Sequence, residues 1–391
     1  MPSAQNIDEY MVLPKEPPAL NIPSSNSTVS VKIIDSTSWI EATLGSLFGP
    51  TIPGHDKLAC PAFAFLIEHE HLNRKILFDL GTRKDWENLA PSIVNTIKAH
   101  KWGVAAEKNV SEILSENGVA LESIEGIIWS HWHYDHTGDP STFPPSTKLI
   151  VGPGFKEALM PGYPVNPNSQ VLETDWKGRE VVEVDFSASG DLMVGNFKAM
   201  DYFGDGSFYI VDAPGHAVGH VCGLARVTPD TFVFMGGDAC HHGGEYRPTE
   251  YLPLPKQIPL DIPSATSRIK SKGGFCPGAA FCDVFHHGKP NKEVYMLTKN
   301  FSHDTDRANL TIKYLEEFDA ADNVFVIIAH DTDLLSKEAE IVFYPNGTLN
   351  DWKAKRLDEK ARWLFLRDFA EAADKGLKQE SEVGEGIVLK P

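Results

Sequence analysis

The sequence predicts an α/β protein, and two observations support that class. Short apolar runs recur along the chain, and each ends in a sharp turn that carries Gly, Asp or His, as in residues 124–130, 208–216 and 231–238. Residues 86–118 instead show apolar side chains at helical spacing, and a similar stretch follows at 351–376. Strands combined with such helices are typical of sheets that helices cover.

The individual elements are expected in the following order. Three β-rich runs predict an opening meander over residues 29–36, 62–69 and 74–81. Two helices are expected next, over 86–100 and 107–118, and Gly118 is a plausible end for the second. The remaining strands are expected at 124–130, 147–154, 208–216, 222–227, 231–238 and 323–331.

Four parts of the chain differ in character. Residues 1–29, rich in Pro, Ser and Asn, are expected to be an arm that is either loose or laid along the surface, and residues 30–349 the main domain. Within it, residues 242–292 are crowded with Pro, Gly and aromatics, which indicates a lid or a wall of a substrate pocket. Residues 350–391 are expected to form an amphipathic helix that packs on the main domain, and then a frayed tail after Gly376. The apolar face of that helix comprises Leu357, Ala361, Leu364, Phe365 and Phe369.

Composition and charge argue against nucleic acids and membranes as partners. The 391 residues allow two or three domains, or a single large one, and a net charge of −18 argues against nucleic acid as a partner. Five cysteines without a CxxC pair suit reduced thiols. Residues 1–20 lack the basic and apolar regions of a signal peptide, so none is expected, and no apolar run is long enough to span a bilayer. A cytoplasmic protein that does not enter membranes and acts on a small molecule is therefore expected.

The stretch HWHYDH, residues 131–136, is the strongest chemical signal in the chain. Alternate side chains of an extended segment point the same way, so His131 and His133 can reach one centre. Asp135 and His136 lie past the turn and can face a second point a few Å away. Imidazoles with one carboxylate are ligands that suit zinc, iron, nickel and cobalt. Core packing is a poor explanation for so many ligands at one strand end.

Other strand ends carry candidate ligands as well. His216 and His220 follow a Pro-Gly turn, and Asp238 follows another apolar run, with His241 and His242 close behind. His330 follows the last apolar run. Taken singly, the Pro-Gly-His segment is explained equally well as a simple turn, and Asp238 as a cap. Together they share one architectural position, the end of a buried strand, which favours a common site.

The order HxHxDH, PGHxxGH, GGD and AHD resembles the metallo-β-lactamase superfamily of binuclear hydrolases, over roughly Val29 to Tyr344. The resemblance implies a four-layer αββα sandwich, with two mixed sheets between outer helices and the metals at one edge. It implies that Asp79, in the FDLG turn, orients a ligand histidine, and that His220 is structural. The metal ligands that it implies are His131, His133 and His216 for the first ion, Asp135, His136 and His330 for the second, and Asp238 as the bridge.

A pair of cations would make hydroxide available near neutrality, and Asp135 would shuttle the proton. Zinc is the expected metal, with iron, manganese or cobalt as alternatives. The motifs most resemble the lactonase-like branch, which includes the N-acyl-homoserine lactonases and commonly has Tyr three positions after the bridging Asp. Here His241 stands at that position, so the expected reaction is the opening of a lactone or a lactam. His241 is either a catalytic donor to the substrate or an ordinary loop histidine.

Four alternatives remain open. Hydrolysis of a thioester of the hydroxyacylglutathione type, or of another ester, would need cations such as Lys353, Lys355 and Arg356, which also suit the solvent face of a helix. Flavodiiron proteins usually have Glu in place of His133 and carry a flavodoxin-like domain, which this chain lacks. A persulfide dioxygenase would hold a single iron. A non-catalytic scaffold would have no chemical need for the full ligand set.

Overall fold

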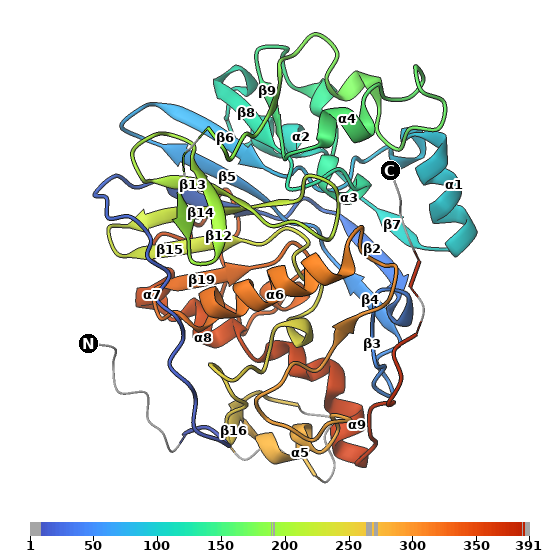
Figure 1. Cartoon of the computed structure of the whole chain (residues 1–391), viewed down its shortest axis with the longest axis vertical. Helices are drawn as coiled ribbons and strands as arrows, with labels where there is room; N and C mark the ends of the chain where they lie inside the picture. Colours follow the sequence, from blue (N-terminus) through green and yellow to red (C-terminus); the bar gives the residue numbers. More distant parts are fainter. Residues whose placement is uncertain are drawn as a thin grey trace.

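Two six-stranded sheets lie at the centre of the molecule (Figure 1). The computed structural model describes residues 9–188, 190, 192–262, 268–269, 273–384 and 386–387. The first sheet has the order β1 (Ser30–Ile34), β5 (Ala64–His69), β6 (Arg74–Phe78), β8 (Ile124–Ile128), β9 (Lys148–Val151) and β10 (Val181–Glu183). The second has the order β11 (Met193–Val194), β12 (Phe197–Asp201), β13 (Phe208–Asp212), β14 (Val221–Thr228), β15 (Thr231–Met235) and β19 (Val324–Ile327).

Both sheets are mixed, as the resemblance implied. In the first, β1, β5 and β6 form the expected antiparallel meander, and β6, β8, β9 and β10 run parallel. In the second, β11 to β15 are antiparallel neighbours, and β19 joins β15 in parallel. The carboxyl ends of β8, β15 and β19 are the positions at which the candidate ligands follow.

Four layers result from the apolar faces of these elements. Phe65 and Phe78 of the first sheet share one buried cluster with Phe208 and Val233 of the second, which places the main core between the sheets. On the outer faces, α2 (Val110–Glu116) packs against the first sheet and α6 (Thr305–Ala320) against the second. The predicted αββα order is confirmed.

Local chemistry explains where these helices begin and end. Asn109 and Glu112 form a capping box at the start of α2, and Gly118, with φ of +80°, follows its end. α1 (Pro91–His100) has Pro at its first turn, where the missing N–H has no partner to lose. Asp304 caps α6 by accepting a hydrogen bond from the Arg307 N–H at 3.0 Å.

A three-stranded sheet was not predicted. It has the order β4 (Lys57–Cys60), β2 (Trp39–Thr43), β7 (Gly103–Ala105), and all its pairs are antiparallel. β2 and β4 come from the segment between β1 and β5, and β7 follows α1; the sheet lies at the right of Figure 1. Two smaller pairs join β3 (Phe48–Gly49) to β18 (Met296–Leu297), and β16 (Gln257–Pro259) to β17 (Phe275–Pro277).

The C-terminal region corrects the prediction of one amphipathic helix. It forms α7 (Trp352–Lys355), α8 (Leu357–Ala361), a 3-10 helix over Leu364–Phe369 and α9 (Ala370–Lys375). Arg356, with φ of 56°, adopts the left-handed conformation that ends a helix, which interrupts the run. The predicted apolar face is nevertheless buried, because the short turns keep these side chains on one side.

The tail after Gly376 is not frayed over the residues that are described. Gln379 is buried, and its side chain donates hydrogen bonds to the carbonyl oxygens of Pro50 and Val294. The N-terminal arm is laid along the surface from residue 9 onward, where Met11 N–H bonds to Leu254 O and Lys15 N–H to Glu250 O. Both termini of the described chain are therefore tied to the body by backbone hydrogen bonds.

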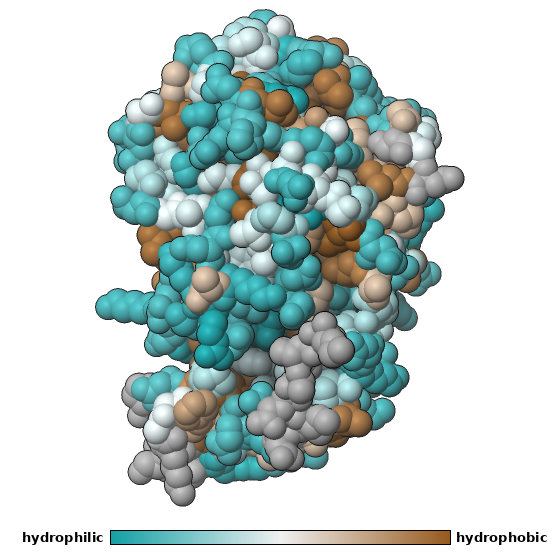
Figure 2. All heavy atoms as spheres, turned by 90° about the vertical axis from the view of Figure 1, so that its left-hand side faces the viewer, coloured by the Kyte–Doolittle hydropathy of each residue, from teal (hydrophilic) through white to brown (hydrophobic). Residues whose placement is uncertain are grey.

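The face in Figure 2 is mostly hydrophilic, with apolar residues in small scattered groups, consistent with the net charge of −18. Across the described residues, none of the helices combines the length and the apolar character that a bilayer crossing requires.

Candidate metal centre

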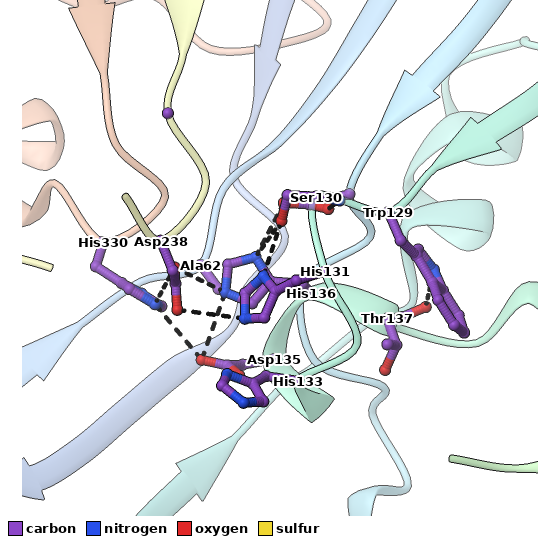
Figure 3. Close-up of polar contacts among 12 residues, drawn as sticks. Ala62, Trp129, Ser130, His131, His133, Asp135, His136, Thr137, Asp238 and His330 are labelled. Atoms are coloured by element: carbon purple, nitrogen blue, oxygen red, sulfur yellow. Dashed lines mark hydrogen bonds and ion pairs between the residues drawn. The ribbon is translucent and has the colours of Figure 1, made fainter. Parts of the chain in front are cut away.

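The candidate ligands meet at one edge of the two facing sheets, and Figure 3 labels all of them except His216. His131 and His133 lie directly after β8, and Asp135 and His136 are in the short helix α3 (Tyr134–Thr137) that follows. Asp238 follows β15, His330 follows β19, and His216 is in the turn after β13. All of these side chains are buried. The structure thus brings together every metal ligand that the resemblance implied.

One group of ligands surrounds a first position. The side chains of His131, His133, His216 and Asp238 each offer an atom within 4.8 Å of the others. His216 Nε2 lies 3.0 Å from His133 Nδ1 and 3.4 Å from Asp238 Oδ2, and His131 Nε2 lies 3.6 Å from the same oxygen. Three ring nitrogens and one carboxylate oxygen are the donor set that Zn²⁺ prefers.

A second group lies on the other side of Asp238. His136 Nε2 and His330 Nε2 are each 3.0 Å from Asp238 Oδ1, and Asp135 Oδ2 is 3.8 Å from His136 and 3.5 Å from His330. Asp238 therefore presents one oxygen to each group. A carboxylate in this position can bridge two cations.

Outer contacts hold the ligand rings in place. Asp79 Oδ2 lies 2.9 Å from His136 Nδ1, and Asp79 Oδ1 accepts a hydrogen bond from the Ser130 N–H at 2.6 Å. His330 Nδ1 lies 2.7 Å from the Pro61 carbonyl oxygen. Such partners leave the opposite nitrogen of each ring, Nε2, free to bind a metal.

His220 belongs to the supporting structure. Its Nδ1 lies 2.9 Å from the Ala213 carbonyl oxygen, and its Nε2 accepts a hydrogen bond from the Asp238 N–H at 3.0 Å. Both ring nitrogens are thus occupied by the backbone, and the ring fixes the turn that carries Asp238.

The electrostatics of the centre fit a cation. Burial, reinforced by neighbouring imidazoles, lowers the pKa of His131 and of His216 well below the usual range, and burial lowers that of His133 to about 3. These rings are therefore neutral, which is the form that binds metals. Burial would also lower the pKa of His136, but Asp238 and Asp79 outweigh it and raise the value to about 10. The carboxylates around His136 thus demand a positive charge, which a proton or a metal ion can supply.

Buried polar atoms that lack hydrogen bonds give a second test of whether metal ions fit this centre. His131 Nε2, His136 Nε2 and Asp238 Oδ1 are buried, and although His136 Nε2 lies 3.0 Å from Asp238 Oδ1, none of the three makes a well-oriented hydrogen bond among the described residues. Unpaired polar atoms at such depth are rare in folded proteins, because each loses its contact with water. Metal ions at the two positions would satisfy all three atoms.

His241 points into this centre, but His242 does not. His241 Nε2 lies 3.2 Å from Asp238 Oδ2, and its ring stacks on that of His330 at 5.6 Å. The buried carboxylate of Glu245 accepts hydrogen bonds from the N–H groups of His241 and His242 at 2.6 and 3.0 Å and fixes this turn. Sequence patterns gave no signal for Glu245.

A further cluster of His55, His242 and Asp368 lies nearby. His242 Nδ1 accepts a hydrogen bond from the Gly244 N–H at 2.9 Å, so the ring proton sits on Nε2, which lies 3.0 Å from Asp368 Oδ2. His55 Nδ1 is occupied by the Tyr295 hydroxyl at 2.7 Å. Because the nitrogen of His242 that faces the cluster carries a proton, the cluster is a hydrogen-bond network and not a metal site.

A cavity of about 70 Å³ opens beside the metal centre. His133, Asp135, His216, Asp238, His241 and His330 form its polar side. Its other lining residues are Ile40, Ala42, Leu47, Leu58, Cys60, Trp102, Tyr134, Phe301 and Ile387. Sequence patterns did not indicate these walls, apart from Tyr134 within the metal motif.

The lining of the cavity differs from one expectation. The expected lid does not contribute to it, since no described residue of 242–292 is among the lining residues. That segment packs through Ile258, Cys276 and Phe281 in the core at the α5 (Gly278–Cys282) end of the molecule.

The three cations considered for a thioester substrate do not line the cavity either. Lys353, Lys355 and Arg356 pair with Asp322, Asp351 and Glu359, respectively. They form exposed ion pairs on the surface of the C-terminal region.

Comparison with known proteins agrees with this geometry. The family model described as the metallo-beta-lactamase superfamily matches residues 58–236. Gamma-lactamase FDB1 of Fusarium pseudograminearum is 42% identical over 376 residues, which cover 94% of this chain and 89% of that protein. The cytochrome P450 monooxygenase mpaDE' of Penicillium brevicompactum is 44% identical over 96% of this chain, but the chain spans only 41% of the length of that protein.

Among solved structures, AiiA of B. thuringiensis with N-decanoyl-L-homoserine at its active site is similar in fold. The match has a TM-score of 0.53 and 16% identity, and it covers 82% of this chain and 99% of that one. The motifs, the αββα layers and the relatives agree, and the chain belongs to the metallo-β-lactamase superfamily.

Proposed function

We propose that the protein is a two-metal hydrolase that opens the ring of an apolar lactam or lactone. The observation that carries the proposal is the position of Asp238, whose two oxygens face two separate groups of ligands. His131, His133 and His216 would hold the first ion, Asp135, His136 and His330 would hold the second, and Asp238 would bridge them. The mostly imidazole donor set favours zinc, and iron, manganese and cobalt suit the same atoms.

When bound, two such cations supply hydroxide near neutrality and polarise the carbonyl of the substrate. The proton transfers are assigned to side chains of the protein. Asp135 lines the cavity beside the second group, where its carboxylate can take the proton of the attacking water. His241 lines the same cavity and can donate a proton to the departing nitrogen or oxygen. One C–O bond forms, the ring C–N or C–O bond breaks, and the water proton ends on the leaving atom.

The walls of the cavity favour a neutral substrate. The lining residues within the described part of the chain include no Lys and no Arg, so the carboxylates of a glutathione thioester would find no cation among them. Aromatic and aliphatic side chains instead suit an apolar body attached to the ring. The relative named gamma-lactamase FDB1, 42% identical over 94% of the chain, makes a five-membered lactam the first substrate to test.

The test combines metal analysis with a substrate panel. The purified protein is expected to hold about two metal ions and to hydrolyse γ-lactams or γ-lactones in preference to thioesters, with activity lost on chelation and regained with Zn²⁺. Asp238→Asn should lose at least about a hundredfold in kcat, because neither position keeps its bridge. Asp205→Asn is the matched control, since Asp205 pairs with His69 at 2.7 Å outside the lining of the cavity. Full activity in Asp238→Asn would refute the proposal.

A further inference from the structure

The segment that follows α9 is attached to the body at several points. The Gln379 N–H donates to Val284 O at 2.8 Å, and the Gln379 side chain donates to Pro50 O at 2.6 Å and to Val294 O at 3.0 Å. Its Oε1 accepts a hydrogen bond from the His286 N–H at 3.1 Å. A buried amide with all of these partners is a strong anchor, because breaking it leaves polar groups unpaired.

Further along, the segment crosses the loops beside the metal centre. The Glu380 N–H donates to Thr51 O at 3.0 Å, the Gly386 N–H to Lys299 O at 2.9 Å and the Ile387 N–H to Ser46 O at 3.2 Å. A Cβ at Gly386 would meet Thr298 Oγ1 at 2.3 Å, so the close approach at this point requires glycine. Figure 1 shows this dark red segment running from α9 past β3 toward β7.

The path ends at the cavity. Ile387 is one of its lining residues, together with Leu47, Trp102 and Phe301. Leu47 follows the residue whose carbonyl accepts the Ile387 N–H, and Phe301 is close to Lys299, which accepts from Gly386. The hydrogen bonds that hold the segment therefore also set the position of the Ile387 side chain in the apolar wall.

We propose that Ile387 determines substrate specificity, and that residues 379–384 and 386–387 act as a strap that positions it. The proposal rests on the function proposed above. Ile387 contacts the apolar body attached to the ring and not the ring carbonyl, which lies at the metal centre. The strap thereby selects neutral substrates with an apolar substituent over the unsubstituted ring.

The experiment compares Ile387→Ala with the wild-type enzyme on γ-lactams and γ-lactones that carry no substituent, a short alkyl chain or a phenyl group. Truncation is expected to lower kcat/KM for the substituted rings by about tenfold, mainly through KM, and to leave the unsubstituted ring within about twofold. Leu377→Ala is the matched control, because Leu377 lies on the same segment, is 39% exposed and does not line the cavity. Equal discrimination by Ile387→Ala and the wild type would overturn the proposal.

A second readout does not depend on hydrolysis. Binding of cyclopentanones with the same substituents, which share the ring and its carbonyl but are not cleaved, is measured by calorimetry on the metal-loaded proteins. We expect affinity to rise with the substituent in the wild type and in Leu377→Ala, but not in Ile387→Ala. If this difference appears while no lactam or lactone is cleaved, the proposed function is wrong and the role of the strap stands. If all three proteins show the same dependence on the substituent, the strap proposal is wrong.

Discussion

Replacing Asp79 by Asn tests whether the centre depends on the contacts behind its ligands. Asp79 is 1% exposed, and its two oxygens serve different partners, the Ser130 N–H and His136 Nδ1. Asparagine keeps the shape but has one acceptor oxygen and one NH2 group. If the oxygen stays on Ser130, the NH2 group faces His136 Nδ1, which must then give up its proton. The proton moves to His136 Nε2, the atom that lies 3.0 Å from Asp238 Oδ1 and is proposed to bind metal.

The expected loss of Zn²⁺ affinity in Asp79→Asn follows from this shift of the His136 proton. Substitution of partners that orient metal ligands typically reduces metal affinity or activity by about 10- to 100-fold. At 1.36 kcal/mol per tenfold, that is about 1.4 to 2.7 kcal/mol. Competition with a coloured chelator measures the Zn²⁺ affinity directly, and hydrolysis rates at saturating Zn²⁺ show how much activity is recovered.

A matched control separates this effect from general damage. Asp205 also forms a carboxylate–histidine pair, with 2.7 Å between Asp205 Oδ2 and His69 Nε2, outside the metal centre. Asp205→Asn should keep wild-type Zn²⁺ affinity. Wild-type Zn²⁺ affinity in Asp79→Asn would show that His136 does not bind metal in the way that its contacts imply.

Three further predictions concern catalysis and stability. His241→Ala should lower kcat by about a hundredfold and change KM much less. His242→Ala is the control and should keep its turnover, because the His242 ring bonds to Gly244 and Asp368. Equal kcat values for the two variants would make His241 an ordinary loop residue. Removing the metal should lower Tm. Zn²⁺ at about a thousand times its Kd should raise the free energy of unfolding by about 4 kcal/mol, and a Tm that does not change with Zn²⁺ would contradict this. Burial raises the pKa of Asp175 to about 7, so the folded state holds a proton that the unfolded state loses, and stability falls as the pH rises from about 4 to about 7. Between pH 5 and pH 7.5, Asp175→Asn should remove about 2.5 kcal/mol of that decline, measured by urea unfolding; an unchanged slope would count against a buried, protonated Asp175.

The metal centre was predictable because its information is local. His131 to His136 form one continuous motif after a buried strand, and Asp238 and His330 each follow another apolar run. Parallel pairing of β15 with β19 brings the ends before Asp238 and His330 to one edge of the second sheet, and the packing of the two sheets places the end of β8 beside them. The supporting role of Asp79 was equally visible, because the FDLG turn directly follows β6, the strand next to β8.

The C-terminal prediction was wrong in one respect and right in another. Apolar residues at helical spacing predicted a single helix, but Arg356 in the left-handed conformation divides it. Periodicity reports which side chains are buried, and Leu357 and Phe369 are. It does not report where the backbone turns between them, because several short helical turns can bury the same face.

Unlike the metal ligands, the residues that form the apolar wall of the cavity could not be predicted from local sequence patterns. Ile40 comes from β2, Trp102 precedes β7, and Ile387 arrives from beyond α9, so residues far apart in sequence share one wall. Short strands such as β2 and β7 pair across more than fifty residues, and no local pattern announces that pairing. The wall also carries no chemistry of its own and needs only apolar side chains of suitable size. A related chain can therefore keep every metal ligand while exchanging the segments around residues 40, 102 and 387. Substrate preference in this family is for that reason better compared through these segments than through the shared ligand motifs.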